Sequence, residues 1–230
     1  MLQPFGPELW TVEGPVVDGM AGFRYPTRMA VIRLTDGGLF IWSPTALSPE
    51  LRRETEALGP VRHIVAPNAL HHMSLPDWHT AFPQALIHGA PGVNAKQPAI
   101  RFASDLGGDP HLAWAGDIRQ VLVPNKIADE VVFFHRTSGT VIFTDLLQNF
   151  SRGWFTGWRG WVARLDRMIG SEPQVPRKFR LALRSATSKE TLRQVLDWPA
   201  ERVLMAHGTP VSSNAAEFLK KALHPVIVSN

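Results

Sequence analysis

Four side chains that could bind a metal ion lie in three separate places of the sequence. His71 and His72 are adjacent in "APNALHH", Asp145 follows "VIFT", and His207 follows "VLMA". Imidazole nitrogens suit zinc and iron, and a carboxylate compensates the charge of the ion. The chain contains no cysteine, so thiolate ligands, thiolate nucleophiles and disulfides are excluded. Nine histidines are scattered along the chain, and a surface or hydrogen-bonded role is the alternative for each.

Each of the three places follows a segment that we predict to be a buried strand. Short apolar runs bounded by turn residues predict strands at 62–66, in "TVIFTDLL" and in "RVLMAHG". In layered α/β folds, strand ends gather at one edge of a sheet, and separate loops build active sites there. We therefore expect the four side chains to converge at one edge of the fold.

Turn and capping signals predict the elements around these strands. A Gly-rich turn between apolar runs at 29–34 and 39–42 indicates a β-hairpin. Ser48, followed by proline and later by Gly59, is typical of a capped helix. The order strand, strand, helix, strand favours helices packed on a sheet. Residues 92–117 are expected to form a long loop with one weak strand.

The overall composition is that of a globular protein with a sizeable core. The 230 residues are 44% hydrophobic and 19% charged, which fits a single α/β domain spanning residues 1–230. A net charge of +4 is a mild excess and gives no strong evidence for nucleic-acid binding. We expect no signal peptide and no transmembrane segment, and a cytoplasmic location. Phosphate-loop, dinucleotide-binding and nucleophile-elbow motifs are absent from the sequence.

The order of these pieces resembles the metallo-β-lactamase-like superfamily over about residues 28 to 210. In that superfamily a hairpin, a helix and a strand lead into an H-x-H-x-D-H motif, and later strands end in a bridging Asp and a final His. Here "FTDLL" and "MAHGTP" resemble the two later elements. "APNALHH" is similar to a branch catalogued only as a domain of unknown function. The resemblance implies a four-layer αββα sandwich and a metal-dependent hydrolase.

The departure from the H-x-H-x-D-H pattern is informative. Laid over "VAPNALHH", the pattern places Pro67 and Ala69 at its first two His, His71 at its Asp and His72 at its last His. The remaining His of the first metal site would fall near Lys126 and is absent too. The resemblance therefore implies one zinc or iron ion rather than two, with these ligands: His71, His72, Asp145 and His207.

Three polar residues are candidates for supporting roles. A register shifted by one places Asn68 at the first His of the pattern, where it would hydrogen-bond a ligand or the substrate. Glu130 could be an extra ligand or a base, although a solvated carboxylate at a strand end is the favoured interpretation. Ser43 stands where the superfamily often has Asp, and it could brace a ligand His or simply end a strand.

The resemblance to the superfamily does not account for the aromatic segment "RGWFTGWRGWVARLDRMIG". Its Trp154, Trp158, Trp161 and Leu165 recur at helical spacing, with arginines elsewhere around the helix. The favoured interpretation is an amphipathic helix packed on the body of the protein. The alternatives are a lid or wall over the site within 152–186, with Trp154 and Trp158 touching substrate, or a face for an anionic partner or a membrane surface.

The expected reaction is the hydrolysis of a small-molecule ester, lactone, thioester or amide. The ion would lower the pKa of water to about 7 and so supply hydroxide, with His72 and Asp145 as catalytic residues. Four protein ligands would fill a tetrahedron, so catalysis would need a fifth position or the loss of one ligand. A non-catalytic ligand-binding protein on a degenerate scaffold and an iron-dependent oxidoreductase are the alternatives. The sequence leaves the oligomeric state open.

Overall fold

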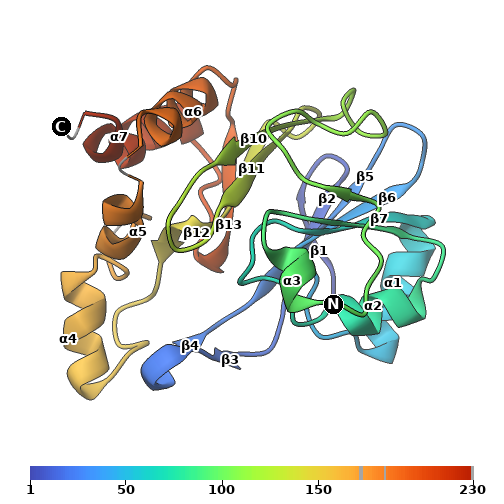
Figure 1. Ribbon diagram of the computed structural model, residues 1–230, viewed down its shortest axis with the longest axis horizontal. Coiled ribbons are helices and arrows are strands. Elements are labelled where there is room, and N and C mark those ends of the chain that lie inside the picture. The colour runs from blue at the N-terminus through green and yellow to red at the C-terminus, as the bar shows by residue number, and fades with distance from the viewer. Residues whose placement is uncertain (171–172, 184, 229–230) are drawn as a thin grey trace.

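The computed structural model describes residues 1–170, 173–183 and 185–228. Two sheets face each other, and helices cover their outer faces (Figure 1). This is the predicted αββα sandwich. The first sheet has the order β1-β2-β5-β6-β7-β8-β9. Its strands are β1 (Gln3–Gly6), β2 (Leu9–Glu13), β5 (Arg28–Arg33), β6 (Leu39–Trp42), β7 (Val61–Ala66), β8 (Leu86–Gly89) and β9 (Ser104–Asp105).

The second sheet has the order β10-β11-β12-β13. Its strands are β10 (Ile118–Val123), β11 (Glu130–His135), β12 (Thr140–Asn149) and β13 (Arg202–Gly208). Helices α1 (Pro49–Leu58) and α2 (Leu75–Ala81) lie outside the first sheet, and α6 (Ala186–Leu196) and α7 (Ala215–Ile227) lie outside the second (Figure 1). No helix in the described part of the chain is both long and apolar enough to cross a membrane.

Local signals account for the hairpin and the helix that follow the N-terminal strands. β5 and β6 pair antiparallel, and in their turn the Gly38 amide donates to Asp36 Oδ1 over 2.8 Å. Gly37 adopts a φ of 82°, which favours glycine. Ser48 accepts a hydrogen bond from the Leu51 amide at the start of α1. The predicted hairpin and capped helix are both confirmed.

Alternating side chains of the second sheet build two cores. Val131 and Phe133 of β11 point into the space between the sheets, where Phe133 packs edge-on against Phe40 with ring centroids 5.6 Å apart. Val132 and Phe134 point to the opposite face and join the core beneath α6 and α7. Because both faces of this sheet are covered, β11, β12 and β13 each contain a continuous apolar run.

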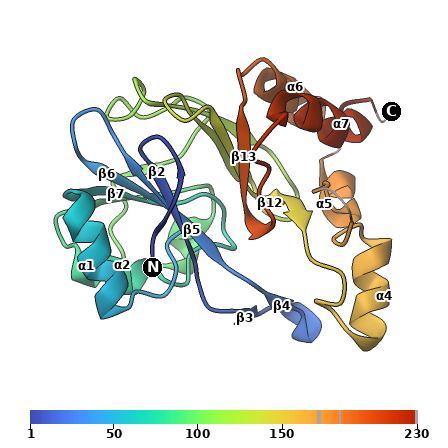
Figure 2. The same cartoon turned by 180° about the vertical axis from the view of Figure 1, so that it is seen from behind.

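The expected loop and the aromatic segment contain further elements. Residues 92–117 include the short helix α3 (Val93–Lys96) besides the weak strand β9. The aromatic segment forms α4 (Gly157–Leu165), followed by α5 (Arg177–Ala182). A small hairpin of β3 (Val17–Asp18) and β4 (Arg24–Tyr25) lies on the same side of the molecule as α4 (Figure 1, Figure 2).

Candidate metal centre

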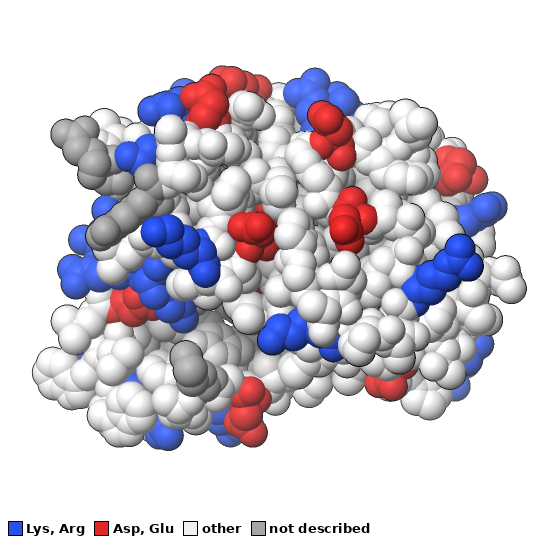
Figure 3. All heavy atoms as spheres, viewed as in Figure 1, with Lys and Arg blue, Asp and Glu red and all other residues white. Residues whose placement is uncertain are grey.

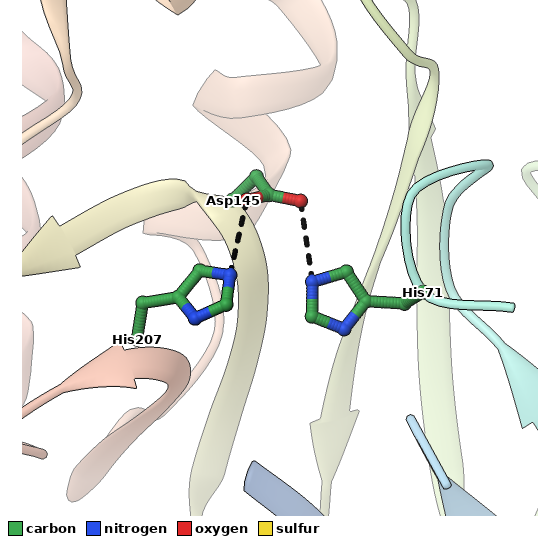
Figure 4. A group of neighbouring side chains, drawn as sticks. All are labelled: His71, Asp145 and His207. Atoms are coloured by element: carbon green, nitrogen blue, oxygen red, sulfur yellow. Dashed lines mark ion pairs between the residues drawn. The ribbon is translucent and has the colours of Figure 1, made fainter. Parts of the chain in front are cut away.

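Three of the four predicted ligands converge at the edge of the sandwich. His71 comes from the loop after β7, Asp145 from β12 and His207 from β13 (Figure 4). Their ligand atoms all lie within 4.8 Å of one another. His71 Nε2 lies 3.4 Å from Asp145 Oδ2, and His207 Nε2 lies 3.3 Å from Asp145 Oδ1. The carboxylate thus stands between the two imidazoles and faces one with each oxygen.

The outward-facing nitrogens of both rings are held by hydrogen bonds. His207 Nδ1 donates to the Pro26 carbonyl over 2.7 Å, because a carbonyl can only accept. In the neutral ring the lone pair then sits on Nε2, which faces the carboxylate. His71 Nδ1 lies 2.8 Å from Ser43 Oγ, so its Nε2 faces the same carboxylate. Hydrogen bonds of this kind on the second nitrogen are typical of metal-binding histidines.

This donor set fits a divalent ion such as zinc or iron. In a tetrahedron with metal–ligand bonds of about 2.0–2.1 Å, neighbouring ligand atoms are ~3.3 Å apart. Each Asp145 oxygen has one imidazole nitrogen near that spacing, His71 at 3.4 Å from Oδ2 and His207 at 3.3 Å from Oδ1. The Nε2 lone pair of a neutral His207 would repel the carboxylate unless a proton or a cation lies between them. Burial by itself would raise the pKa of Asp145, but hydrogen bonds and charge from both histidines outweigh it and hold that pKa well below its usual range.

An interruption in the second sheet presents Asp145 to the site. The pairing of β12 with β13 is irregular within residues 143–148. There the Glu130 carboxylate takes the place of a neighbouring strand and accepts hydrogen bonds from three successive backbone amides, over 2.7, 2.8 and 3.1 Å. These amides belong to Thr144, Asp145 and Leu146. Glu130 therefore supports the backbone that carries Asp145, the central residue of the group.

The interpretation of Glu130 as a solvated carboxylate is wrong. Its exposed fraction is 1%, because β11 lies inside its sheet. Burial raises the pKa of Glu130 to about 8, and the negative charge of Asp145 adds to the increase. The three amide donors act in the opposite direction. Glu130 is outside the group of three and contacts it through the backbone and through Asn68.

Asn68 lies directly behind the carboxylate. It is completely buried, and its Nδ2 donates to Asp145 Oδ2 over 2.8 Å. Its own Oδ1 accepts from the Leu70 amide, which fixes the amide group in this orientation. Gln148 Nε2 donates to the other carboxylate oxygen over 3.2 Å. Each Asp145 oxygen thus receives one amide hydrogen bond and faces one imidazole.

His72 does not join the group, so the expected set of four ligands is corrected to three. Its Nδ1 lies 3.0 Å from Gln97 Nε2, which also donates to the His72 carbonyl. The turn in which the His71 amide bonds to the Asn68 carbonyl sends adjacent side chains in different directions. Burial, Lys96 and His71 lower the pKa of His72, which keeps the ring neutral at neutral pH.

The aromatic neighbours of His207 are Tyr25 and Phe150, whereas Trp154 and Trp158, the candidates for substrate contacts, make other contacts. Tyr25 and Phe150 lie against the His207 ring, with centroids 5.5 and 6.1 Å away. Trp154 instead donates its Nε1 hydrogen to the Arg24 carbonyl, and Trp158 packs edge-on against Phe23. Tyr25 is the one tyrosine of the sequence, and it lies far along the chain from His71, Asp145 and His207.

Arg28 is a supporting residue that the sequence did not reveal. Its guanidinium is buried and donates to the carbonyls of Met205 and Gly208, on either side of His207. It also pairs with Glu13 over 2.6 Å. In the sequence, an arginine before an apolar run predicts a solvent-exposed residue at the start of a strand. Only the packing of the two sheets against each other shows that Arg28 is buried beside His207.

Comparison by sequence gives one match. The family model described as a domain of unknown function, DUF4336, matches residues 7–96, which include His71 and Asn68. No curated protein matches the chain.

Comparison by structure gives many similar folds. The metallo-β-lactamase DIM-1, solved after exposure to ceftazidime, is 12% identical, with a TM-score of 0.65 over 98% of this chain and 96% of that one. The mono-zinc form of FIM-1 from Pseudomonas aeruginosa is 11% identical, with a TM-score of 0.64 over 100% and 96%. A metallo-β-lactamase from Pontibacter korlensis is 11% identical, with a TM-score of 0.63 over 100% and 99%. This chain therefore has the fold of the metallo-β-lactamases.

Proposed function

We propose that this protein is a hydrolase that depends on one divalent metal ion, held by His71, Asp145 and His207. The observation that carries the proposal is the geometry of these three side chains. They come from three separate elements, their ligand atoms lie within 4.8 Å of one another, and the far side of each is fixed by another hydrogen bond. A surface cluster formed by chance would lack that second set of contacts.

The number of ligands suits catalysis better than the four expected from the sequence. Catalytic zinc sites use three protein ligands and keep a position open, whereas four protein ligands are typical of closed structural sites. Moving His72 out of the set leaves three. The mono-zinc form of FIM-1 shows that a protein of this fold can be obtained with one zinc ion.

The chain's own residues would bind and orient the reactants. A divalent ion in this position supplies hydroxide at neutral pH and compensates charge on a carbonyl oxygen. Asp145 and the two histidines would hold it, and Ser43 and Asn68 would keep these ligands in one orientation. Tyr25 and Phe150 would shape an apolar side beside His207. We propose a small-molecule ester, lactone, thioester or amide as substrate.

The paired histidines provide a matched test. Metal content is measured on the purified full chain and on His71→Ala, His207→Ala and His72→Ala, after incubation with zinc or with iron(II) and removal of free ion. We expect about one ion per chain in the wild type and in His72→Ala, and a loss in the other two variants. The metal-loaded wild type is then assayed on a panel of esters, lactones, thioesters and amides.

Two results would contradict the proposal. A folded wild type that retains neither metal excludes the ion site. If the wild type retains metal but hydrolyses no substrate class faster than His207→Ala does, the protein binds metal and is not a hydrolase. Circular dichroism of each variant checks that the fold is intact.

A further inference from the structure

The aromatic stripe of α4 faces the solvent, contrary to the favoured interpretation of its sequence. The exposed fractions of the side chains are 54% for Trp158, 70% for Trp161 and 64% for Leu165. Ala163 is the residue of α4 that is buried. An exposed apolar stripe containing two tryptophans on one short helix is unusual and marks an interaction surface.

Packing beneath the helix holds the stripe in this outward position. Phe155, just before α4, lies within 5.1 Å of Phe23 and 4.9 Å of Phe150 between ring centroids. After the helix, the Met168 amide donates to the Ala163 carbonyl, and both residues join the same small core. Arg159 Nε donates to the Ala21 carbonyl in the segment between β3 and β4. The stripe is therefore the outer side of a well-packed element.

The charge around the stripe is strongly positive. Residues 150–170 contain four arginines and a single acid, Asp166, which accepts from the Lys178 amide over 2.8 Å. Arg152 and Arg164 are exposed and line a hollow of about 270 Å³ with Phe155 and Trp161. In Figure 3 the surface over α4, at the lower left, is largely uncharged and is bordered mostly by Lys and Arg.

We propose that α4 is a membrane-binding surface for anionic lipid bilayers. Trp158, Trp161 and Leu165 insert at the level of the headgroups, and Arg152 and Arg164 contact lipid phosphates. Tryptophan favours the boundary between water and hydrocarbon, and helices that lie in the bilayer interface combine an aromatic and aliphatic face with arginines. The nine residues of α4 are too few to span a bilayer, so it lies along the surface.

The excess of arginine over acidic residues around α4 favours an anionic membrane over a protein partner. A protein partner could also use tryptophan and arginine. A surface with three net positive charges in 21 residues, however, complements the fixed negative charge of an anionic leaflet. The proposal does not depend on the metal centre.

The test is co-sedimentation of the full chain with vesicles. Phosphatidylcholine vesicles are compared with vesicles that also contain phosphatidylglycerol, at low and high salt. We expect binding to the anionic vesicles that falls at least tenfold in high salt. The double variant Trp161→Ser/Leu165→Ser should lower the partition coefficient at least tenfold, and Arg152→Gln/Arg164→Gln should remove most of the preference for anionic lipid.

Matched controls are available on other elements. Leu112→Ser/Leu86→Ser changes two exposed leucines, and Arg119→Gln/Arg136→Gln changes two exposed arginines. Both should bind vesicles like the wild type. Absence of vesicle binding, binding equal for the two lipid mixtures, or equal losses in the control variants would overturn the proposal. Self-association that Trp161→Ser/Leu165→Ser abolishes, without vesicle binding, would identify α4 as a contact between copies instead.

Discussion

At the scale of single residues, adjacent histidines have different tasks. His71 faces Asp145 with one nitrogen and Ser43 with the other, whereas His72 contacts Gln97. The Ser43 hydroxyl is positioned by an uncommon backbone, with a φ of 52°. A non-glycine residue in that conformation costs energy and persists only where the surrounding structure requires it. We attribute this conformation to the need to bring the hydroxyl under His71.

We predict that Ser43→Ala lowers zinc affinity by about 10- to 100-fold, as is typical when the hydrogen-bond partner of a ligand histidine is lost. Competition against a chelator of known affinity measures the change. Ser43→Gly is the control, because it also lacks the hydroxyl but relieves the strain at positive φ. If Ser43→Gly retains the wild-type affinity, the hydroxyl has no role in holding His71.

At the scale of elements, the interruption within β12 places Asp145 between His71 and His207. A regular strand would pair its amides with β11, whereas here the Glu130 carboxylate accepts three of them. A side chain that replaces a strand partner can hold the backbone out of the regular ladder without leaving buried donors unsatisfied. The Glu130 carboxylate thus supports the backbone at Asp145 within the irregular part of β12.

We predict that Glu130→Ala lowers the free energy of unfolding by about 3 kcal/mol or more, since each buried donor left unsatisfied costs ~1–3 kcal/mol. Urea unfolding with excess chelator measures this change without a contribution from bound metal. Glu130→Gln keeps an acceptor oxygen and should lose less. Equal losses in the two variants would mean that packing, and not hydrogen bonding, explains the effect.

A second histidine cluster lies between β7, β8 and the loop before β10. His63 Nδ1 lies 3.2 Å from His88 Nε2, and both rings pack edge-on against Trp114. Burial and the charge of His111 lower the pKa of His63 to about 4, and burial with the charges of His63 and His111 lowers that of His88 to about 3. The cluster is therefore neutral in the folded protein at neutral pH.

We predict that this cluster destabilises the protein in mild acid. Both folded pKa values lie below the unfolded value of 6.5, so the unfolded chain binds more protons between pH 6.5 and about 4. Stability is complete above pH 6.5 and falls as the pH decreases through that window. Urea unfolding at pH 7.5, 5.5 and 4.5 should show the decline, and His88→Gln should flatten it. An unchanged slope in His88→Gln would assign the acid sensitivity to other groups.

At the scale of the whole molecule, one buried arginine joins the two sheets at the site. Arg28 is the first residue of β5, and its guanidinium donates to the carbonyls of Met205 and Gly208 in β13. The Pro26 carbonyl, two residues earlier, accepts from His207. The first sheet therefore helps to position His207, a candidate ligand that belongs to the second sheet.

We predict that Arg28→Met lowers both the free energy of unfolding and the zinc affinity, because two buried carbonyls lose a charged donor. The loss of stability should be about 2–3 kcal/mol or more. Arg33→Met is the control on the same strand, since Arg33 also pairs with a glutamate but is more exposed. It should leave zinc affinity unchanged. A loss of affinity as large in Arg33→Met would refute the special role of Arg28.

The sequence by itself predicted the strands, the main turns and the three candidate ligands of the group, together with His72, which lies outside it. Apolar alternation and turn residues are local signals, so they revealed the β5–β6 hairpin and the strands that carry Asp145 and His207. They also revealed the start of α1 at Ser48. These features depend on a few neighbouring residues, which is why a single sequence sufficed.

The tertiary structure decided which side chains meet. The choice of His71 over His72 depends on how a loop turns beneath Ser43, and the burial of Glu130 depends on the sheet that encloses it. The exposure of the tryptophan stripe depends on Phe155 and its neighbours occupying the small core beneath α4. Each of these outcomes is set by contacts between residues far apart in the chain, and local periodicity carries no information about such contacts.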